Sequence, residues 1–302
     1  MRLRHGGIAD FRLQYELVGP ADAPLLIVAG GISAGRHVVA SDGASEPGWW
    51  QAQAAAFARH RLLAIDWLGA DGAIDLPIDP ADQADAIVWV LGELGVSRAA
   101  AFIGASYGAM VGMHVAVRHS GRIGALLAIS APDRPHPYAS ACRALQRHAV
   151  GLGETHGNPA AGVALARAMA MLTYRTPEEF GERFAADPEV HSHRVRVAAE
   201  PYLEAQGARH CQRMSAQAYR RLSESIDLHR VDPTEISCPL ALVAVDTDAL
   251  VPAEDMRTVA AKIPGSAFHL IRSRFGHDAF LKEERQVAAI ITDFLDSLEP
   301  TQ

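Results

Sequence analysis

Short apolar segments recur along the chain and alternate with longer segments in which apolar residues return every three or four positions. The first pattern is typical of strands buried on both faces, and the second of amphipathic helices. We therefore expect a half-exposed strand at residues 11–18 and buried strands at 25–29, 61–66, 99–103, 123–129, 239–245 and 267–271. Helices are expected at residues 49–60, 80–94, 109–119, 254–262 and 284–298. This alternation predicts a doubly wound, mostly parallel sheet of the α/β class.

The alternation is interrupted once, from about residue 134 to residue 232. The pattern there is helical almost throughout, with breaks at short Gly- or Pro-containing segments such as 151–153 and 187–188. A helical insertion in a parallel sheet is most simply a cap over the active-site edge. We predict an α/β core made of residues 1–133 and 233–302, with a helical cap made of residues 134–232.

One pentapeptide suggests a nucleophile. Gly104-Ala-Ser-Tyr-Gly108 follows an expected buried strand and precedes an expected helix. In a strand–turn–helix of the form G-x-S-x-G, the serine occupies the apex of a strained turn with its hydroxyl exposed. The glycines are needed because strand and helix backbones crowd the apex. The alternative is a glycine-rich turn whose serine only caps the helix. We favour Ser106 as a nucleophile because possible partners follow downstream.

A serine hydroxyl needs an imidazole to take its proton and a carboxylate to orient that imidazole. In this kind of fold the three groups follow in the order Ser, Asp, His. Asp246 and Asp248 follow one expected strand, and His277 follows the last one. Both positions lie at carboxyl ends of strands, where open α/β sheets place their sites. We select Asp248 because it lies within the loop, and Asp246 remains the alternative acid.

Acyl transfer also needs N–H donors aimed at the developing oxyanion. The amide of Tyr107, directly after the nucleophile, is one candidate. The amide of Ile32 is the other, because it follows Gly30-Gly31 at the end of an expected strand. The alternative for this glycine pair is an ordinary tight turn.

Composition narrows the functional classes. The chain has 302 residues, 49% of them hydrophobic, and a net charge of −7 without a dense Lys/Arg block, which argues against a nucleic-acid surface. Its three cysteines are odd in number and lack metal-ligand spacing, so we expect neither a disulfide framework nor a metal site. No signal-like segment opens the sequence, and no apolar run is long enough to span a membrane. We expect a cytoplasmic protein with no membrane or nucleic-acid partner.

The chain resembles the homoserine O-acyltransferases, enzymes of methionine synthesis with the α/β-hydrolase fold. Four stretches carry the likeness, and together they span almost the whole chain. They are Gly30-Gly-Ile-Ser-Ala-Gly-Arg-His37 with Gly48-Trp-Trp50, Gly104-Ala-Ser-Tyr-Gly-Ala-Met110, the cap-helix run of Ala164-Leu-Ala-Arg167 with Met171-Leu-Thr-Tyr-Arg175 and residues 180–184, and Asp246-Thr-Asp248 with Gly276-His-Asp-Ala-Phe-Leu281. The last hexapeptide and the cap-helix run are more specific to the family than the G-x-S-x-G pentapeptide.

The resemblance implies a triad of Ser106, Asp248 and His277, with Arg167 and Asp278 holding L-homoserine. An Arg fork suits the carboxylate of homoserine, and Asp278 suits its ammonium group. Tyr174 either adds a hydroxyl to this pocket or belongs to the core. The implied reaction transfers an acetyl or succinyl group from acyl-CoA, a co-substrate, through an acyl-serine, without a cofactor. The resemblance also suggests a homodimer.

The sequence departs from the family in two segments and at Tyr107, the residue directly after the serine. The loop after the strand expected at 61–66 is short, and the cap segment between residues 140 and 158 is compressed. Both changes touch surfaces that could receive CoA, so the sequence leaves the identity of the acyl donor undecided. A succinyl donor would need a cation in the acyl pocket, for which Arg36 is one candidate among several. Three alternatives to homoserine acylation remain: a serine hydrolase of esters or thioesters, an L-serine O-acyltransferase, and a non-enzymatic binding module.

Overall fold

The computed structural model describes residues 1–298. Its centre is a seven-stranded sheet with the order β1-β3-β2-β4-β5-β8-β9. The strands are β1 (Tyr15–Val18), β2 (Leu25–Ala29), β3 (Arg61–Ile65), β4 (Ala101–Ala105), β5 (Leu126–Ile129), β8 (Leu240–Val245) and β9 (Ala267–Ile271). Neighbours are parallel except β1 and β3, which pair antiparallel. The sheet is therefore mostly parallel, as the alternating pattern predicted.

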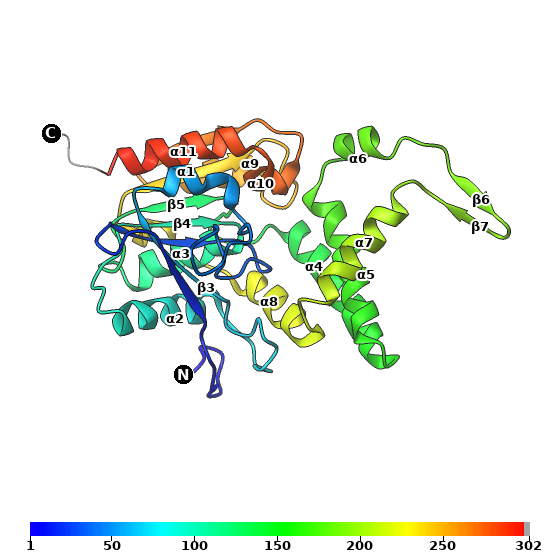
Figure 1. Cartoon of the computed structure of the whole chain (residues 1–302), viewed down its shortest axis with the longest axis horizontal. Coiled ribbons are helices and arrows are strands. Elements are labelled where there is room, and N and C mark those ends of the chain that lie inside the picture. The colour runs from blue at the N-terminus through cyan, green and yellow to red at the C-terminus, as the bar shows by residue number, and fades with distance from the viewer. Residues whose placement is uncertain (299–302) are drawn as a thin grey trace.

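Helices cover both faces of this sheet (Figure 1). One face packs against α2 (Pro80–Glu93), α3 (Tyr107–Arg118) and α9 (Ala253–Ala261). The other packs against α1 (Ala54–Phe57) and α11 (Glu284–Asp296). Strands β4, β5 and β8 are buried along their whole lengths. Two apolar layers thus hold these strands in place, and with them the loops that leave their carboxyl ends.

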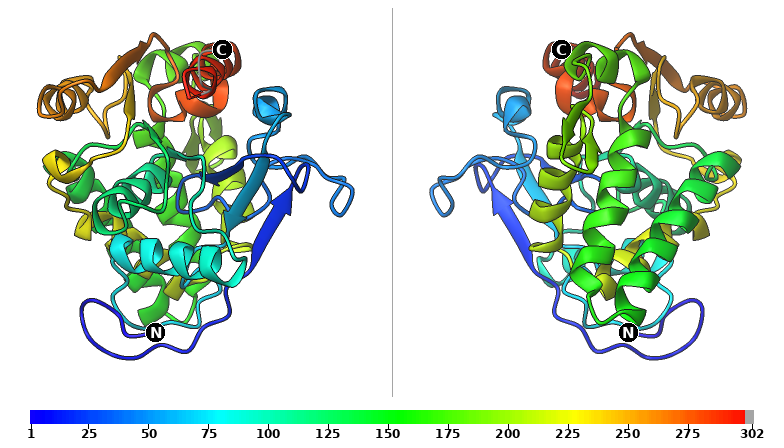
Figure 2. Two further views of the ribbon diagram at one scale, coloured as in Figure 1. Left: turned by 90° about the vertical axis from the view of Figure 1, so that its left-hand side faces the viewer. Right: turned by 90° about the vertical axis from the view of Figure 1, so that its right-hand side faces the viewer.

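The chain leaves the sheet after β5 and returns to it at β8. In between it forms α4 (Pro137–Thr155), α5 (Pro159–Tyr174), α6 (Pro177–Arg183), α7 (Glu200–Cys211) and α8 (Ala216–Leu228). Figure 1 shows α4 to α7 beside the sheet, and the right-hand view of Figure 2 shows the green helices of this region in front of it. Helix α5 packs between α4 and α7. We call residues 134–232 the cap.

The cap also contains a small hairpin where the sequence pattern indicated helix. Strands β6 (Glu189–His191) and β7 (Arg194–Arg196) pair antiparallel around a turn at Ser192, whose φ is 54°. Figure 1 shows the hairpin projecting away from the sheet. Its residues are almost all exposed, so no buried apolar face distinguishes it in the sequence. The helical expectation is therefore wrong at these residues.

Several element boundaries also differ from the expected ones. The first strand is confined to Tyr15–Val18, and the helix expected at 49–60 is a 3₁₀ turn (Gln51–Gln53) followed by α1. Strand β4 begins and ends two residues later than expected, because Gly104 and Ala105 still pair with β5. Short helical turns complete the described fold: η2 (Pro233–Glu235), η3 (Gly276–Asp278) and α10 (Ala279–Lys282). Within residues 1–298, no helix has the length and apolar character needed to cross a bilayer.

Candidate active site

Ser106 occupies the turn between β4 and α3. Its backbone has φ 54° and ψ −121°, a left-handed conformation that few residues other than glycine adopt. The turn is held from both sides, because the Ser106 amide donates to Ile129 O at 2.8 Å and its carbonyl accepts from Ala109 N at 3.0 Å. Backbone strain of this kind persists only where the surroundings impose it, and it lifts the hydroxyl above the sheet edge.

The two glycines of the elbow are sterically required. A Cβ on Gly104 would lie 2.6 Å from the Cα of Ala109, and a Cβ on Gly108 would lie 2.2 Å from the carbonyl oxygen of Ala29. Both obstacles are backbone atoms, which cannot move aside as a side chain can. The crowding expected from the G-x-S-x-G spacing is therefore present at both positions.

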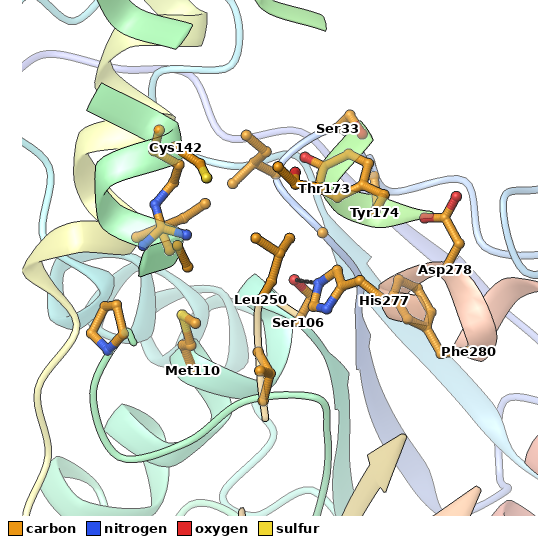
Figure 3. Close-up of a pocket in the computed structure, with 18 of the residues that line it drawn as sticks. Ser33, Ser106, Met110, Cys142, Thr173, Tyr174, Leu250, His277, Asp278 and Phe280 are labelled. Atoms are coloured by element: carbon orange, nitrogen blue, oxygen red, sulfur yellow. Dashed lines mark hydrogen bonds between the residues drawn. The ribbon is translucent and has the colours of Figure 1, made fainter. Parts of the chain in front are cut away.

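His277 joins Ser106 to Asp248. Its Nε2 lies 2.8 Å from the Ser106 Oγ, and its Nδ1 lies 2.7 Å from Asp248 Oδ2 (Figure 3 shows the Ser106 contact). The other oxygen of Asp248 accepts from the amides of Leu250 and Val251, each at 2.9 Å. The carboxylate is fully buried and fixed by three donors, so it holds the imidazole with Nε2 facing the serine.

Two opposing effects act on the imidazole. Burial lowers the pKa of His277, whereas the charge and hydrogen bond of Asp248 raise it, and the net result is a pKa above the ordinary value of 6.5. Asp278 adds to the increase, and the positive charge of Arg143 works against it. A more basic imidazole is a better acceptor for the proton of the serine hydroxyl.

Asp246, the alternative acid, is not in contact with His277. Its Oδ1 accepts from the amide of Ser273 at 3.0 Å and so ties the loop after β8 to the loop after β9. The structure therefore gives the two carboxylates different partners. Asp248 contacts the imidazole, and Asp246 braces the loops that carry both residues.

The amides of Ile32 and Tyr107 are unoccupied donors beside Ser106. Within residues 1–298 neither donates a hydrogen bond to another protein group. The loop that carries Ile32 is fixed by Gly30 O, which accepts from Gly108 N at 2.8 Å, and by Trp67 Nε1, which donates to Gly31 O at 3.0 Å. A Cβ on Gly30 would meet Ala34 and Trp49, whereas one on Gly31 would meet nothing, so only the first glycine is needed for close packing.

A cavity of about 180 Å³ lies over Ser106, between the sheet edge and the cap. Arg167 and Tyr174, both on α5, line it (Figure 3 shows Tyr174). The Arg167 guanidinium lies 5.3 Å from the centre of the Tyr174 ring, which stacks on the His277 ring at 5.9 Å. Arg167 makes no ion pair or hydrogen bond to any other group in the described part of the chain. Tyr174 thus lines the pocket and also packs against the core.

Asp278 lines the same cavity and is held by a cap residue. Arg175 Nε donates to Asp278 Oδ2 at 2.7 Å, and Arg175 also pairs with Glu179. Burial lowers the pKa of Arg175, but the two carboxylates and Tyr202 more than offset this, and the guanidinium stays charged. The Oδ1 atom of Asp278 has no protein partner within residues 1–298, which leaves it free to accept from a ligand.

The chain is similar to known proteins in both sequence and structure. The alpha/beta hydrolase fold family matches residues 24–284. A homoserine O-succinyltransferase of Xanthomonas campestris pv. campestris is 52% identical over 299 residues, which cover 97% of this chain and 81% of that protein. The chain belongs to the homoserine O-acyltransferase family. Its fold is accordingly the α/β-hydrolase fold.

Other relatives show how widely this architecture is used. A homoserine O-acetyltransferase of Thermus thermophilus is 38% identical over 232 residues, covering 72% of this chain and 58% of that protein. The solved structure of esterase E22 superposes with a TM-score of 0.86 at 16% identity, covering 98% of this chain and 97% of that one. At that identity the likeness shows only a shared fold. The names of the homoserine O-acyltransferase relatives differ in the acyl group.

Sequence reasoning missed two residues that shape the cavity and the loop beside it. Trp67 fixes the loop of Ile32, and Arg143 of α4 lines the cavity. Neither carried a signal, since a tryptophan after a strand and an arginine on a helix are both common. Arg36, named above as a cation for a succinyl group, instead pairs with Asp66 and does not line this cavity. That suggestion is wrong, because Arg36 lies outside the cavity above Ser106.

Proposed function

We propose that the protein transfers an acyl group from acyl-CoA to the γ-hydroxyl of L-homoserine. The observation that carries this proposal is the unpaired guanidinium of Arg167 in the cavity above Ser106. A half-buried guanidinium without an ion pair or hydrogen bond to the protein suits a ligand carboxylate, and the free oxygen of Asp278 suits an ammonium group. A zwitterionic amino acid supplies both, and family membership supports homoserine as that amino acid. The ester so formed would serve methionine biosynthesis in the cytoplasm.

In the first half-reaction Ser106 attacks the thioester carbonyl while His277 Nε2 takes its proton. The amides of Ile32 and Tyr107 donate to the oxyanion as it forms. Asp248 keeps Nδ1 protonated and stabilises the imidazolium. The carbon–sulfur bond then breaks, and the proton passes from Nε2 to the sulfur of the departing CoA. An acyl ester on Ser106 Oγ remains.

In the second half-reaction the γ-hydroxyl of homoserine gives its proton to the same Nε2 and attacks the acyl-serine carbonyl. Arg167 holds the carboxylate of the amino acid, and Asp278 holds its ammonium group. The bond between the carbonyl carbon and Ser106 Oγ breaks, and Oγ recovers the proton from His277. O-Acylhomoserine leaves, and the enzyme returns to its starting state without any cofactor.

Steady-state kinetics with both substrates varied test this sequence of steps. An acyl-enzyme that forms before homoserine binds gives parallel double-reciprocal lines, whereas intersecting lines would contradict the proposal. Ser106→Ala should lower kcat by about 10⁴-fold or more. The circular dichroism spectrum of this variant should match that of the wild type, since alanine is no larger than serine.

The same catalytic groups would serve a hydrolase if water reached the acyl-enzyme, and the esterase likeness in fold makes this comparison necessary. CoA release from acyl-CoA should rise strongly with homoserine and little with water alone. L-Serine is the third acceptor to compare, because it has the same carboxylate and ammonium groups but a hydroxyl one carbon closer to them. A rate of CoA release that depends on neither amino acid would contradict the transferase and indicate a thioesterase.

A further inference from the structure

The turn between α5 and α6 lies directly against residues 274–278 of the core. Thr176 Oγ1 donates a hydrogen bond to the carbonyl oxygen of Arg274. Beside this bond the two backbones nearly touch, because a Cβ on Gly276 would lie 2.7 Å from the carbonyl oxygen of Tyr174. Gly276 has a φ of 58°, which glycine adopts without strain. This turn of the cap and this loop of the core are therefore held in one arrangement.

Arg175 lies in that turn and bridges two carboxylates. Its Nε donates to Asp278 Oδ2 at 2.7 Å, and its Nη1 donates to Glu179 Oε1. Only 10% of the Arg175 side chain and 5% of the Glu179 side chain are exposed, so both charges are largely removed from water. Within residues 1–298 neither side chain lines the cavity above Ser106. The shortest route from them to a ligand in that cavity is through Asp278, which does line it.

The bridge leaves one oxygen of Asp278 for a ligand. The terminal torsion of an aspartate is soft, so a carboxylate without a partner samples several directions. Arg175 holds Oδ2, whereas Oδ1 has no partner among the described residues. Figure 3 shows this carboxylate beside Tyr174. An acceptor that is already oriented binds an ammonium group without first having to be ordered.

Glu179 keeps this group of side chains negative. An ion pair between Arg175 and Asp278 alone would be neutral and would attract an ammonium group only weakly. Glu179 offers a second carboxylate to the same guanidinium, so the three side chains together carry a charge of about −1. Arg183 also pairs with Glu179, at 3.0 Å, but 41% of its side chain is exposed and water screens its charge. Oε2 of Glu179 is buried without a partner within residues 1–298, a cost to stability that a purely structural carboxylate would not need to bear.

We propose that Arg175 is a positioning residue for the amino group of the acyl acceptor and that Glu179 supports it. This inference rests on the proposed function and deepens it. Asp278 binds the ammonium group of homoserine, and Arg175 fixes the orientation in which it does so. Neither Arg175 nor Glu179 makes or breaks a bond. The arrangement selects acceptors that carry an amino group and has no part in forming the acyl-enzyme.

The test compares two acyl acceptors that differ only in the amino group, L-homoserine and 4-hydroxybutyrate. With the better of acetyl-CoA and succinyl-CoA as donor, the wild type should prefer homoserine by about 10- to 100-fold in kcat/KM, the range expected for one charged hydrogen bond. Arg175→Gln should lower kcat/KM for homoserine by about 10-fold, mainly through KM, with little change for 4-hydroxybutyrate. Arg175→Lys keeps the charge but lacks the fork that holds two carboxylates, so its acceptor ratio should be intermediate.

Two further variants separate positioning from structure. Arg183→Gln is the matched control, because Arg183 shares Glu179 but makes no contact with Asp278 in the described part of the chain, and it should leave the acceptor ratio unchanged. Glu179→Gln should narrow the ratio less than Arg175→Gln does, and it carries the test if Arg175→Gln fails to fold. Pre-steady-state CoA release without an acceptor reports acyl-enzyme formation and should be the same in every variant.

Equal losses with both acceptors in Arg175→Gln would overturn the inference, and so would slower acyl-enzyme formation with an unchanged acceptor ratio. A wild type that does not distinguish the two acceptors would also overturn it. If 4-hydroxybutyrate is not acylated, its inhibition constant against homoserine takes the place of its kcat/KM in each comparison. Absence of transfer to homoserine itself would instead remove the proposed function.

Discussion

The two walls of the cavity are held in place by different means. On the sheet side, Ser106, Asp248 and His277 stand in turns at the carboxyl ends of β4, β8 and β9, and backbone hydrogen bonds fix the first two turns. On the cap side, Arg143 and Arg167 stand on helices that are positioned by packing and ion pairs. Under the proposed function, the sheet side supplies the catalytic groups and Asp278, and the cap supplies Arg167 for the homoserine carboxylate. One wall can therefore change in a relative while the other is retained.

The largest effect that tests this division is on the sheet side. Asp248→Asn keeps the size of the side chain but removes the charge that orients and stabilises the imidazole, and kcat should fall by about 10⁴-fold. Asp246→Asn is the matched control, because Asp246 contacts only the neighbouring loop and should cost far less. Stopped-flow or steady-state CoA release measures both. Equal losses of kcat in the two variants would mean that kcat depends on the loop as a whole and not on the contact between Asp248 and His277.

The next effect separates recognition from chemistry on the cap side. Arg167→Gln removes the proposed partner of the homoserine carboxylate, so KM for homoserine should rise by about 10- to 100-fold with a smaller change in the rate of the acyl-enzyme step. Pre-steady-state CoA release without homoserine measures that step. Arg209→Gln, at an exposed position of α7, is the control. If Arg167→Gln instead slows the formation of the acyl-enzyme, Arg167 takes part in the chemistry and not only in the binding of homoserine.

The sequence revealed the sheet side far better than the cap. Glycines, a strand boundary and chain order located Ser106, Asp248 and His277, because backbone geometry demands those residue types at those places. The two acids were separated only by their loop positions, and the contact with His277 favours Asp248. Arg143 was missed and Arg36 misassigned, because the position of a long side chain depends on which carboxylate lies nearby. Only the family resemblance indicated Arg167.

A buried histidine pair lies where the cap returns to the core. His114 of α3 and His229, just after α8, are 3.2 Å apart from Nε2 to Nδ1. Burial lowers the pKa of His114 to about 3 and that of His229 to about 4. The unfolded chain binds these protons below pH 6.5 while the folded one does not, so stability is complete above 6.5 and is lost as the pH falls toward 4.

Each pH unit in that window should cost about 1.4 kcal/mol per histidine that stays neutral in the folded state. Urea unfolding at several pH values from 7 to 4.5 measures the slope. His114→Gln keeps a hydrogen-bonding side chain but cannot titrate, so its stability should fall less steeply with acid than that of the wild type. Identical slopes would show that His114 does not contribute to the acid sensitivity.

The smallest effect concerns the packing of the cap itself. Gly151 of α4 has open space where a Cβ would be, whereas a Cβ on Gly162 of α5 would lie 2.8 Å from the carbonyl oxygen of Ala149. Gly151→Ala should raise the free energy of unfolding by about 0.5–1 kcal/mol, because alanine favours the helix. Gly162→Ala should lower it by pushing α4 and α5 apart. Chemical denaturation distinguishes the two, and a gain at both positions would contradict close helix packing.

The link between Arg175 and Asp278 has a consequence for recombining parts of such proteins. Asp278 is the residue directly after His277, and its partner comes from the cap. A chimera that joins this core to a foreign cap would break the pair and leave a partly buried carboxylate one peptide bond from His277. Crossover designs must therefore transfer positions 175 and 278 as a unit, although more than a hundred residues of sequence separate them.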